Sequence, residues 1–126
     1  MSDQQVTRIT RSVIVAVSDT ALRQAIVTRL ALASGLEVEV REGYAEDIAE
    51  RDVVIATPPD CSPRAYRELV QRGVRVILIS AAHPPRPHRH YVRAGLRSCV
   101  SIRDLWGEGL LKALRQTIEG EEQAAP

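Results

Sequence analysis

Hydrophobic and polar positions along this chain follow two patterns that alternate with one another. Short apolar runs rich in Val and Ile are typical of buried strands, and apolar residues spaced three and four apart are typical of amphipathic helices. These patterns predict strands and helices in strict alternation. The strands are expected at 12–17, 36–40, 53–57, 74–80 and 98–102, and the helices at 20–34, 44–51, 62–72, 88–94 and 105–119.

Residues with strong preferences for helix ends mark the limits of these elements. Asp19, Ser62 and Asp104 are expected to cap helix N-termini, because short polar side chains accept hydrogen bonds from the free backbone N–H groups there. Glycine tolerates the left-handed backbone that ends many helices, so helix stops are expected at Gly35, Gly73, Gly95 and Gly120. Strands joined by helices through short loops imply right-handed crossovers and a parallel sheet covered on both faces. The expected architecture is therefore an α/β three-layer sandwich.

The composition agrees with one such domain and argues against several function classes. The chain has 126 residues, the length of a single domain, and no Phe, so its core must consist of Val, Ile, Leu and Ala. A net charge of +1 provides no general attraction to nucleic acid or to a membrane surface. No apolar run approaches the ~18 residues of a membrane span, and residues 1–11 are polar, so a cytoplasmic protein is expected. Cys61 and Cys99 have no disulfide or zinc-site spacing.

Four stretches occur in an order and at intervals that are similar to those of a known family. They are Leu22-Arg23, Asp52-Val53-Val54-Ile55, Val76-Ile77-Leu78-Ile79-Ser80-Ala81 and Arg93-Ala94-Gly95. On these motifs, residues 12–119 resemble the receiver domain of two-component response regulators. The resemblance implies a flavodoxin-like sheet of five parallel strands in the order 2-1-3-4-5, with the reaction site at the carboxyl ends of strands one, three, four and five. We expect residues 12–120 to form this domain, residues 1–11 to be a flexible segment, and residues 121–126 to be a tail or the start of a linker.

The resemblance also implies a set of groups for phosphoryl transfer, and this chain lacks most of them. A receiver needs an acidic pair that holds Mg²⁺, an aspartate that accepts the phosphoryl group, a hydroxyl and a lysine. The acidic pair falls at Val17-Ser18. The aspartate falls at Thr57 and the lysine at Ile102, whereas the hydroxyl is kept at Ser80. The chain's single lysine, Lys112, lies inside the last predicted helix, so no small shift of the alignment restores the missing one. We therefore expect a pseudo-receiver that has lost phosphorylation, with no metal, no cofactor and no enzymatic activity.

Alternative interpretations remain open for the degenerate phosphorylation pocket, whose members are Ser18, Asp19, Thr57, Ser80 and Ile102. Its hydroxyls, with that of Ser101, either line a site for a small ligand near helix N-termini or surround a shallow, wet or collapsed pocket. Asp19 either caps the first helix or joins Asp60 as a metal ligand. Thr57 either packs and bonds within a rigid Thr57-Pro58-Pro59 turn or is modified by a separate kinase.

Candidate interaction surfaces lie outside this pocket. The densest positive cluster comprises Arg86, Arg89, Arg93 and Arg97, with His83, His88 and His90 in the same segment. It is either a solvated face or a site for an acidic partner, and the histidines suffice for a metal only with a further ligand from elsewhere. The last helix carries an apolar stripe that is either core or, around Trp106, a dimer contact: Trp106, Leu110, Leu111, Leu114 and Ile118. The candidate interface residues are Arg89, Arg93, Trp106 and Leu110.

These observations predict a phosphorylation-independent pseudo-receiver that acts as a regulatory protein-interaction or dimerisation domain. On the resemblance, it serves signal transduction in a bacterial response-regulator-type transcription regulator, with a DNA-binding output domain expected beyond Pro126. The expected partners are a second copy, another protein or that output domain; neither nucleic acid nor a membrane is an expected partner of the domain itself. The alternative is a small-ligand sensor that uses the hydroxyl-lined pocket. An enzyme is not expected, because no nucleophile and base occupy suitable positions and no glycine-rich phosphate loop is present.

Overall fold

The computed structural model describes residues 11–32, 38–42, 52–82, 86–96, 98–105 and 107–124. Within them the strands are β1 (Arg11–Ala16), β2 (Val38–Glu42), β3 (Val53–Ala56), β4 (Arg75–Ser80) and β5 (Ser98–Ser101). The α-helices are α1 (Thr20–Ala31), α2 (Pro63–Gln71), α3 (Arg89–Arg93) and α4 (Gly109–Ala124), and short 3-10 helices η1 (Pro58–Asp60) and η2 (Ile102–Asp104) follow β3 and β5. The helix predicted at 44–51 and the helix stop predicted at Gly35 lie outside the described residues.

The strands form one sheet in the order β2-β1-β3-β4-β5. Every neighbouring pair runs parallel. In the centre of the sheet, Val15 of β1 lies opposite Ile55 of β3, which in turn lies opposite Ile77 of β4. The prediction of an α/β fold built on a parallel sheet is confirmed.

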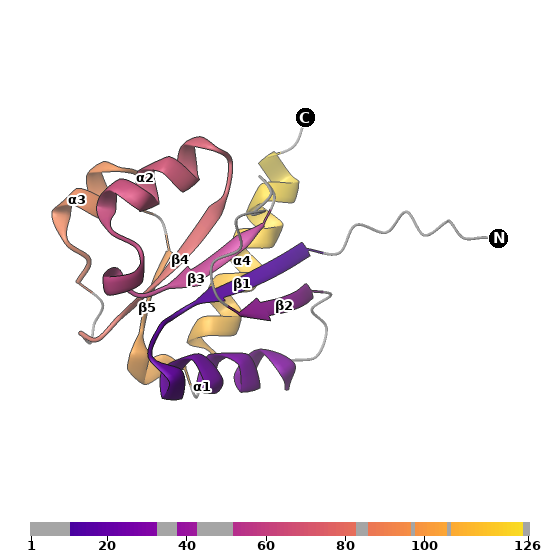
Figure 1. Ribbon diagram of the computed structural model, residues 1–126. Coiled ribbons are helices and arrows are strands. Elements are labelled where there is room, and N and C mark those ends of the chain that lie inside the picture. Colours follow the sequence, from indigo (N-terminus) through magenta and orange to yellow (C-terminus); the bar gives the residue numbers. More distant parts are fainter. Residues whose placement is uncertain are drawn as a thin grey trace.

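Helices cover both faces of the sheet. Successive strand residues point to opposite sides, and because the strands are continuously apolar, each face presents apolar side chains that a helix must bury. One set of buried side chains joins the sheet to α1 and α4: Val13, Val15, Ile55, Ile77, Ile26, Leu30, Leu110 and Leu114. The other set joins the sheet to α2 and α3: Ile14, Ala16, Val54, Leu78, Tyr66, Leu69 and Tyr91. Figure 1 shows α2 and α3 together on one side of the sheet and α1 on the other. The predicted three-layer sandwich is confirmed.

The core is built from branched aliphatic side chains, as the absence of Phe requires. Ile14, Ile55 and Ile77 are fully buried in three adjacent strands. Complete burial of one such side chain stabilises the fold by about 1.5–3 kcal/mol relative to leaving it exposed. Continuous apolar runs, rather than alternating ones, are what a strand buried on both faces requires.

Local signals place several helix ends correctly. Asp19 caps α1, since its carboxylate accepts a 2.9 Å hydrogen bond from the backbone N–H of Leu22. The hydroxyl of Ser62 caps α2 in the same way. The glycines that follow α2 and α3 have the positive φ angles of left-handed helix stops, 86° at Gly73 and 101° at Gly95.

The last helix begins later than the sequence predicts. α4 starts at Gly109, and Asp104, the predicted cap, instead ends η2. The chain folds back tightly here: a Cβ atom placed on Gly109 would lie only 2.6 Å from the Cβ of Asp104, a separation that only glycine permits. Gly107 and Gly109 also disfavour an early helix start. In the first turn of α4, the backbone N–H of Lys112 donates to the carbonyl of Glu108 at 2.8 Å, so the prediction that Asp104 caps the helix is wrong.

The end of α4 and the position of β2 also differ from the predictions. The helix continues through Gly120 to Ala124, so the predicted stop at Gly120 is wrong. A glycine inside a helix costs about 1 kcal/mol relative to alanine, and the Glu, Gln and Ala residues after it favour helix. β2 lies at Val38–Glu42 instead of 36–40, because its parallel pairing with β1 begins with Arg11 opposite Val38. An edge strand tolerates the polar residues that this register includes.

Candidate functional site

The carboxyl ends of β1, β3, β4 and β5 lie at one edge of the sheet, where the loops to the following helices begin. Parallel α/β sheets bind ligands at this edge. All the pocket residues predicted from the sequence lie at these strand ends or in the loops that follow: Ser18, Asp19, Thr57, Ser80 and Ile102. The structure adds one residue to them, Asp60, the last residue of η1.

Asp60 links the loop after β1 to the loop after β3. Its Oδ2 atom accepts a hydrogen bond of 2.9 Å from the backbone N–H of Ser18. The same atom accepts a second bond, also of 2.9 Å, from the hydroxyl of Thr57. One carboxylate oxygen therefore holds together the ends of two neighbouring central strands.

The bonds to Asp60 favour the ionised form of its side chain. The hydrogen bond from the Ser18 backbone is the main cause that lowers the pKa of Asp60 below its ordinary value of 3.8. Burial acts in the opposite direction, and hydrogen bonds from the hydroxyls of Ser18 and Thr57 lower the pKa further. At neutral pH the site thus contains a permanent negative charge that belongs to the chain itself.

A single turn of 3-10 helix brings Asp60 back over the end of β3. The backbone N–H groups of Asp60 and Cys61 both donate to the carbonyl of Thr57 at 3.0 Å. Pro58 and Pro59 between them fix the backbone φ angles of the turn. This geometry supports the interpretation of Thr57 as a hydrogen-bonding residue in a rigid turn.

From the sequence, Asp60 is expected only as a possible metal ligand, and its bonding role is not predicted. A local signal was present, because Thr57-Pro58-Pro59-Asp60 has the spacing of a capping box, although here the carboxylate accepts from the Thr57 hydroxyl and not from its backbone N–H. The second partner, Ser18, lies 42 residues earlier in the chain. No local motif reveals a contact of that separation.

Asp19 lies at the start of α1 next to this cluster and acts as the helix cap described above. Nearby, the guanidinium of Arg23 donates a 3.0 Å hydrogen bond to the carbonyl of Val17, the residue that follows β1. Of the two interpretations of Asp19, the structure supports the cap. Within the described residues, no group of three or more His, Cys, Asp and Glu side chains is arranged to hold a metal ion.

The hydroxyls of Ser80 and Ser101 bond within their own loops. The buried Oγ of Ser80 accepts a 3.1 Å bond from the backbone N–H of Ala82. The Oγ of Ser101, which is fully buried, accepts a 3.2 Å bond from the backbone N–H of Arg103. Both residues thereby shape the turns that leave β4 and β5. Ile102 follows as the first residue of η2 and remains 36% exposed, which places an apolar surface where the resemblance implies a lysine.

The predicted interface residues separate into different environments. Arg89 and Arg93 are exposed on α3, as an interface requires. Leu110 is fully buried in the core between α4 and the sheet, so its assignment to an interface is wrong. The reason is the helical period, which places Leu110 on the same face as the fully buried Leu114, four residues later. Trp106 lies outside the described residues.

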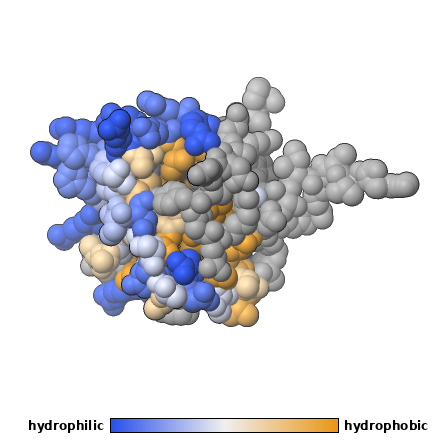
Figure 2. Space-filling view, viewed as in Figure 1, coloured by the Kyte–Doolittle hydropathy of each residue, from blue (hydrophilic) through white to orange (hydrophobic). Residues whose placement is uncertain are grey.

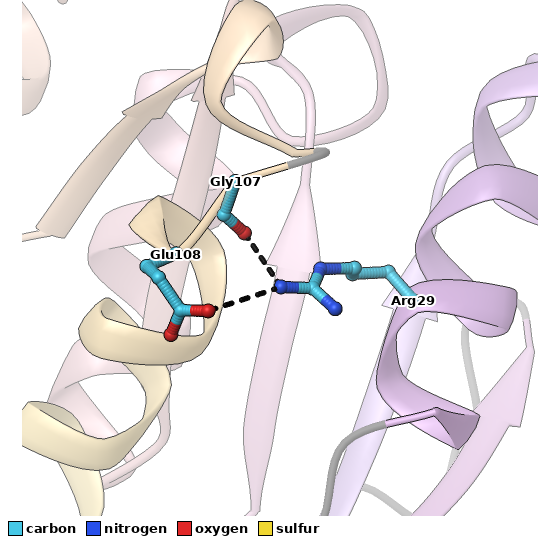
Figure 3. Close-up of polar contacts among 3 residues, drawn as sticks. All are labelled: Arg29, Gly107 and Glu108. Carbon is cyan, nitrogen blue, oxygen red and sulfur yellow. Dashed lines mark hydrogen bonds and ion pairs between the residues drawn. The ribbon is translucent and has the colours of Figure 1, made fainter.

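A second long-range contact fixes where α4 begins. Figure 3 shows Arg29 of α1 reaching across to the loop that precedes α4. Its Nη2 atom donates to the carbonyl of Gly107 at 2.7 Å and lies 3.6 Å from the carboxylate of Glu108. The arginine side chain is largely buried, whereas that of Glu108 is 76% exposed. The bond to the carbonyl therefore contributes more than the ion pair, which water screens.

Comparison with solved structures identifies the architecture. The signal receiver domain of the response regulator NarL from Mycobacterium tuberculosis aligns with 90% of this chain and 99% of its own length, with a TM-score of 0.67 and 17% sequence identity. The chain has a receiver-like fold. FixJ-N matches 89% of this receiver-like chain and 96% of its own, with a TM-score of 0.65 and 15% identity.

A third solved structure, ChrA, extends beyond the region that matches this chain. ChrA, the response regulator of a heme-sensing two-component system, matches 93% of this chain with a TM-score of 0.67 and 19% identity, and the match covers 61% of ChrA. The structural similarity establishes the receiver-like fold. Because the sequence identities are low, the chemistry of the site depends on the residues of this chain. No protein-family model matches the sequence, and no curated protein does. In the described residues, no helix is both long and apolar enough to cross a membrane.

Proposed function

We propose that this receiver-like chain is a pseudo-receiver, a regulatory domain that works without accepting a phosphoryl group. The observation that carries the proposal is the Asp60 bridge between Ser18 and Thr57. A phosphoryl group on a receiver presents negative oxygens that neighbouring groups hold at this edge of the sheet. Here an ionised carboxylate of the chain already accepts hydrogen bonds from the loops after β1 and β3.

The residue types at the site support the same conclusion. Thr57 has no carboxylate to form an acyl phosphate, and its hydroxyl is engaged with Asp60. Ile102 offers no charge to a phosphoryl oxygen, and the chain's single lysine, Lys112, is exposed on α4. An incoming anion would also meet the negative charge of Asp60, and like charges at close range repel. The proposal therefore includes the absence of phosphoryl transfer and of any other enzymatic role.

In this account the domain regulates through contact with other proteins or with a second copy of itself. The receiver-like fold supports a place in response-regulator signalling in the cytoplasm, and the matched region of ChrA shows this fold joined to additional chain. A fused DNA-binding output domain and control of transcription are part of the proposal. The binding of a small ligand at the hydroxyls is less well supported, because Thr57, Ser80 and Ser101 already bond within the chain.

Incubation with acetyl phosphate and Mg²⁺ tests the proposal. We expect the intact mass and the oligomeric state to stay unchanged, because Thr57 stands at the acceptor position and the nearby Asp60 carboxylate is engaged with Ser18 and Thr57. A response regulator with an intact aspartate, treated in parallel, provides the positive control. Stoichiometric, Mg²⁺-dependent addition of a phosphoryl group to this chain would overturn the proposal.

A further inference from the structure

Helices α2 and α3 form one continuous outer layer. The rings of Tyr66 on α2 and Tyr91 on α3 meet edge to face, with their centroids 5.9 Å apart. The hydroxyl of Tyr91 also donates a 2.7 Å hydrogen bond to the carbonyl of Cys61, just before α2. The two helices lie side by side in Figure 1. Their outward side chains therefore belong to one surface.

This surface has a one-sided charge. Residues 61–103 contain nine arginines and a single acidic residue, Glu68. Six of these arginines are exposed on or next to α2 and α3 and define what we call the arginine face: Arg64, Arg67, Arg72, Arg86, Arg89 and Arg93. Figure 2 shows strongly hydrophilic side chains gathered over this part of the molecule. Because the whole chain has a net charge of only +1, its positive charge is segregated onto this layer.

The stability of the fold does not explain this segregation. Arg89 and Arg93 are four residues apart on α3, a spacing at which like charges destabilise a helix. Arg64 lies 3.6 Å from Glu68, in an exposed pair of the kind that adds little. Between the two arginines of α3 lies Val92, an apolar side chain that is 57% exposed. Arginine is enriched at protein interfaces, and Val92 adds an apolar contact among the arginines of α3.

We propose that the arginine face binds an acidic protein segment that also carries an apolar side chain, which contacts Val92. This proposal rests on the proposed regulatory function and names the chemistry of the partner. Guanidinium groups bind carboxylates with paired hydrogen bonds, and arginine is favoured over lysine where such pairing matters. Nucleic acid fits less well, because both tyrosines of this layer are buried and offer no stacking surface, and because a phosphate backbone gains nothing from Val92.

Fluorescence anisotropy with a labelled amphipathic peptide of glutamate and leucine tests this proposal on the full chain. We expect Arg89→Glu and Arg93→Glu each to weaken peptide binding about fivefold to tenfold, and Val92→Ser to weaken it without changing its salt dependence. Lys112→Glu is the matched control, since it alters net charge equally at an exposed position of α4, on the opposite side of the sheet. Circular dichroism confirms that each variant is folded.

Each remaining outcome overturns the assignment. If the unmodified chain does not bind the peptide, the proposal is wrong. It is also wrong if Lys112→Glu loses as much peptide affinity as the arginine variants, because binding would then depend on net charge alone. Tighter binding of a duplex oligonucleotide that is lost in the same variants would assign the face to nucleic acid instead. These variants leave Thr57 and Asp60 intact, so failure here is distinguishable from phosphorylation in the acetyl phosphate experiment.

Discussion

The carboxylate of Asp60 accepts a hydrogen bond of 2.9 Å from the backbone N–H of Ser18, a residue 42 positions earlier in the chain. This bond closes the edge of the sheet at which the receiver resemblance implies a phosphorylation site. With the second bond from Thr57, it gives the two loops a fixed arrangement that depends on the chain alone. The account therefore predicts effects of substitutions at Asp60 that do not depend on Mg²⁺ or on a phosphoryl donor.

Removal of the Asp60 carboxylate should destabilise the fold. Asp60→Ala leaves the backbone N–H of Ser18 and the hydroxyls of Ser18 and Thr57 without their acceptor, and we expect a loss of about 1–2 kcal/mol in the free energy of unfolding. Thr57→Val removes one donor and should cost less. Ser18→Ala keeps the backbone N–H and removes only the hydroxyl bond, so it should also cost less than Asp60→Ala. Urea unfolding of the three variants measures this order, and an equal loss in Ser18→Ala and Asp60→Ala would contradict it.

The contribution of Asp60 should depend on pH in a defined direction. Its pKa is lower in the folded chain than in the unfolded chain, chiefly through the Ser18 hydrogen bond, so the folded state favours the ionised form. The stabilisation is complete well above the ordinary value of 3.8 and is lost as the pH falls through the folded pKa. The difference in unfolding free energy between the unmodified chain and Asp60→Asn should therefore shrink on acidification below about pH 4. A difference that grows at low pH would refute this linkage.

The contact between α1 and the loop before α4 should depend on the arginine more than on the glutamate. Arg29→Ala removes the 2.7 Å bond to the Gly107 carbonyl together with buried side-chain packing, and we expect a cost of about 1–2 kcal/mol. Glu108→Gln removes only an exposed charge 3.6 Å away and should change stability by less than about 0.5 kcal/mol. Thermal unfolding of the two variants tests this prediction, which a larger effect of Glu108→Gln would exclude.

Two neighbouring glycines should respond differently to the addition of one methyl group. A Cβ on Gly109 would lie 2.6 Å from the Cβ of Asp104, so Gly109→Ala forces the start of α4 to shift and should destabilise by about 1–3 kcal/mol. A Cβ on Gly107 would meet nothing closer than the Asp104 carbonyl at 4.0 Å, so Gly107→Ala serves as the control. Similar denaturation midpoints for the two variants would argue against the tight turn.

The sequence predicts those features of the fold that depend on neighbouring residues. The apolar run at 53–57 identifies a strand whose described residues are buried on both faces, and Asp19 and Ser62 identify helix starts through bonds that span three residues. The start of α4 was not predictable, because it depends on the close approach of Asp104 to Gly109 and on Arg29 from another helix. Local capping preference favoured Asp104, and tertiary packing overrode it.

The candidate site shows the same division between local and long-range information. On the receiver resemblance, Thr57 and Ile102 stand at positions where an aspartate and a lysine are expected, and this follows from the sequence alone. The bridge that occupies the site depends on a contact between two loops that only the parallel packing of β1 and β3 brings together. The apolar stripe of the last helix leaves core and interface both open for Leu110, and only its packing beside Leu114 against the sheet decides for the core.

Amide hydrogen exchange at Ser18 tests the central claim most directly, because this amide is the donor to Asp60. The account predicts slow exchange in the unmodified chain without Mg²⁺ or a phosphoryl mimic, unchanged when both are added, and faster exchange in Asp60→Ala. Rapid exchange in the unmodified chain that slows only with Mg²⁺ and the phosphoryl mimic would contradict it, since the loops would then be held together by phosphorylation chemistry after all.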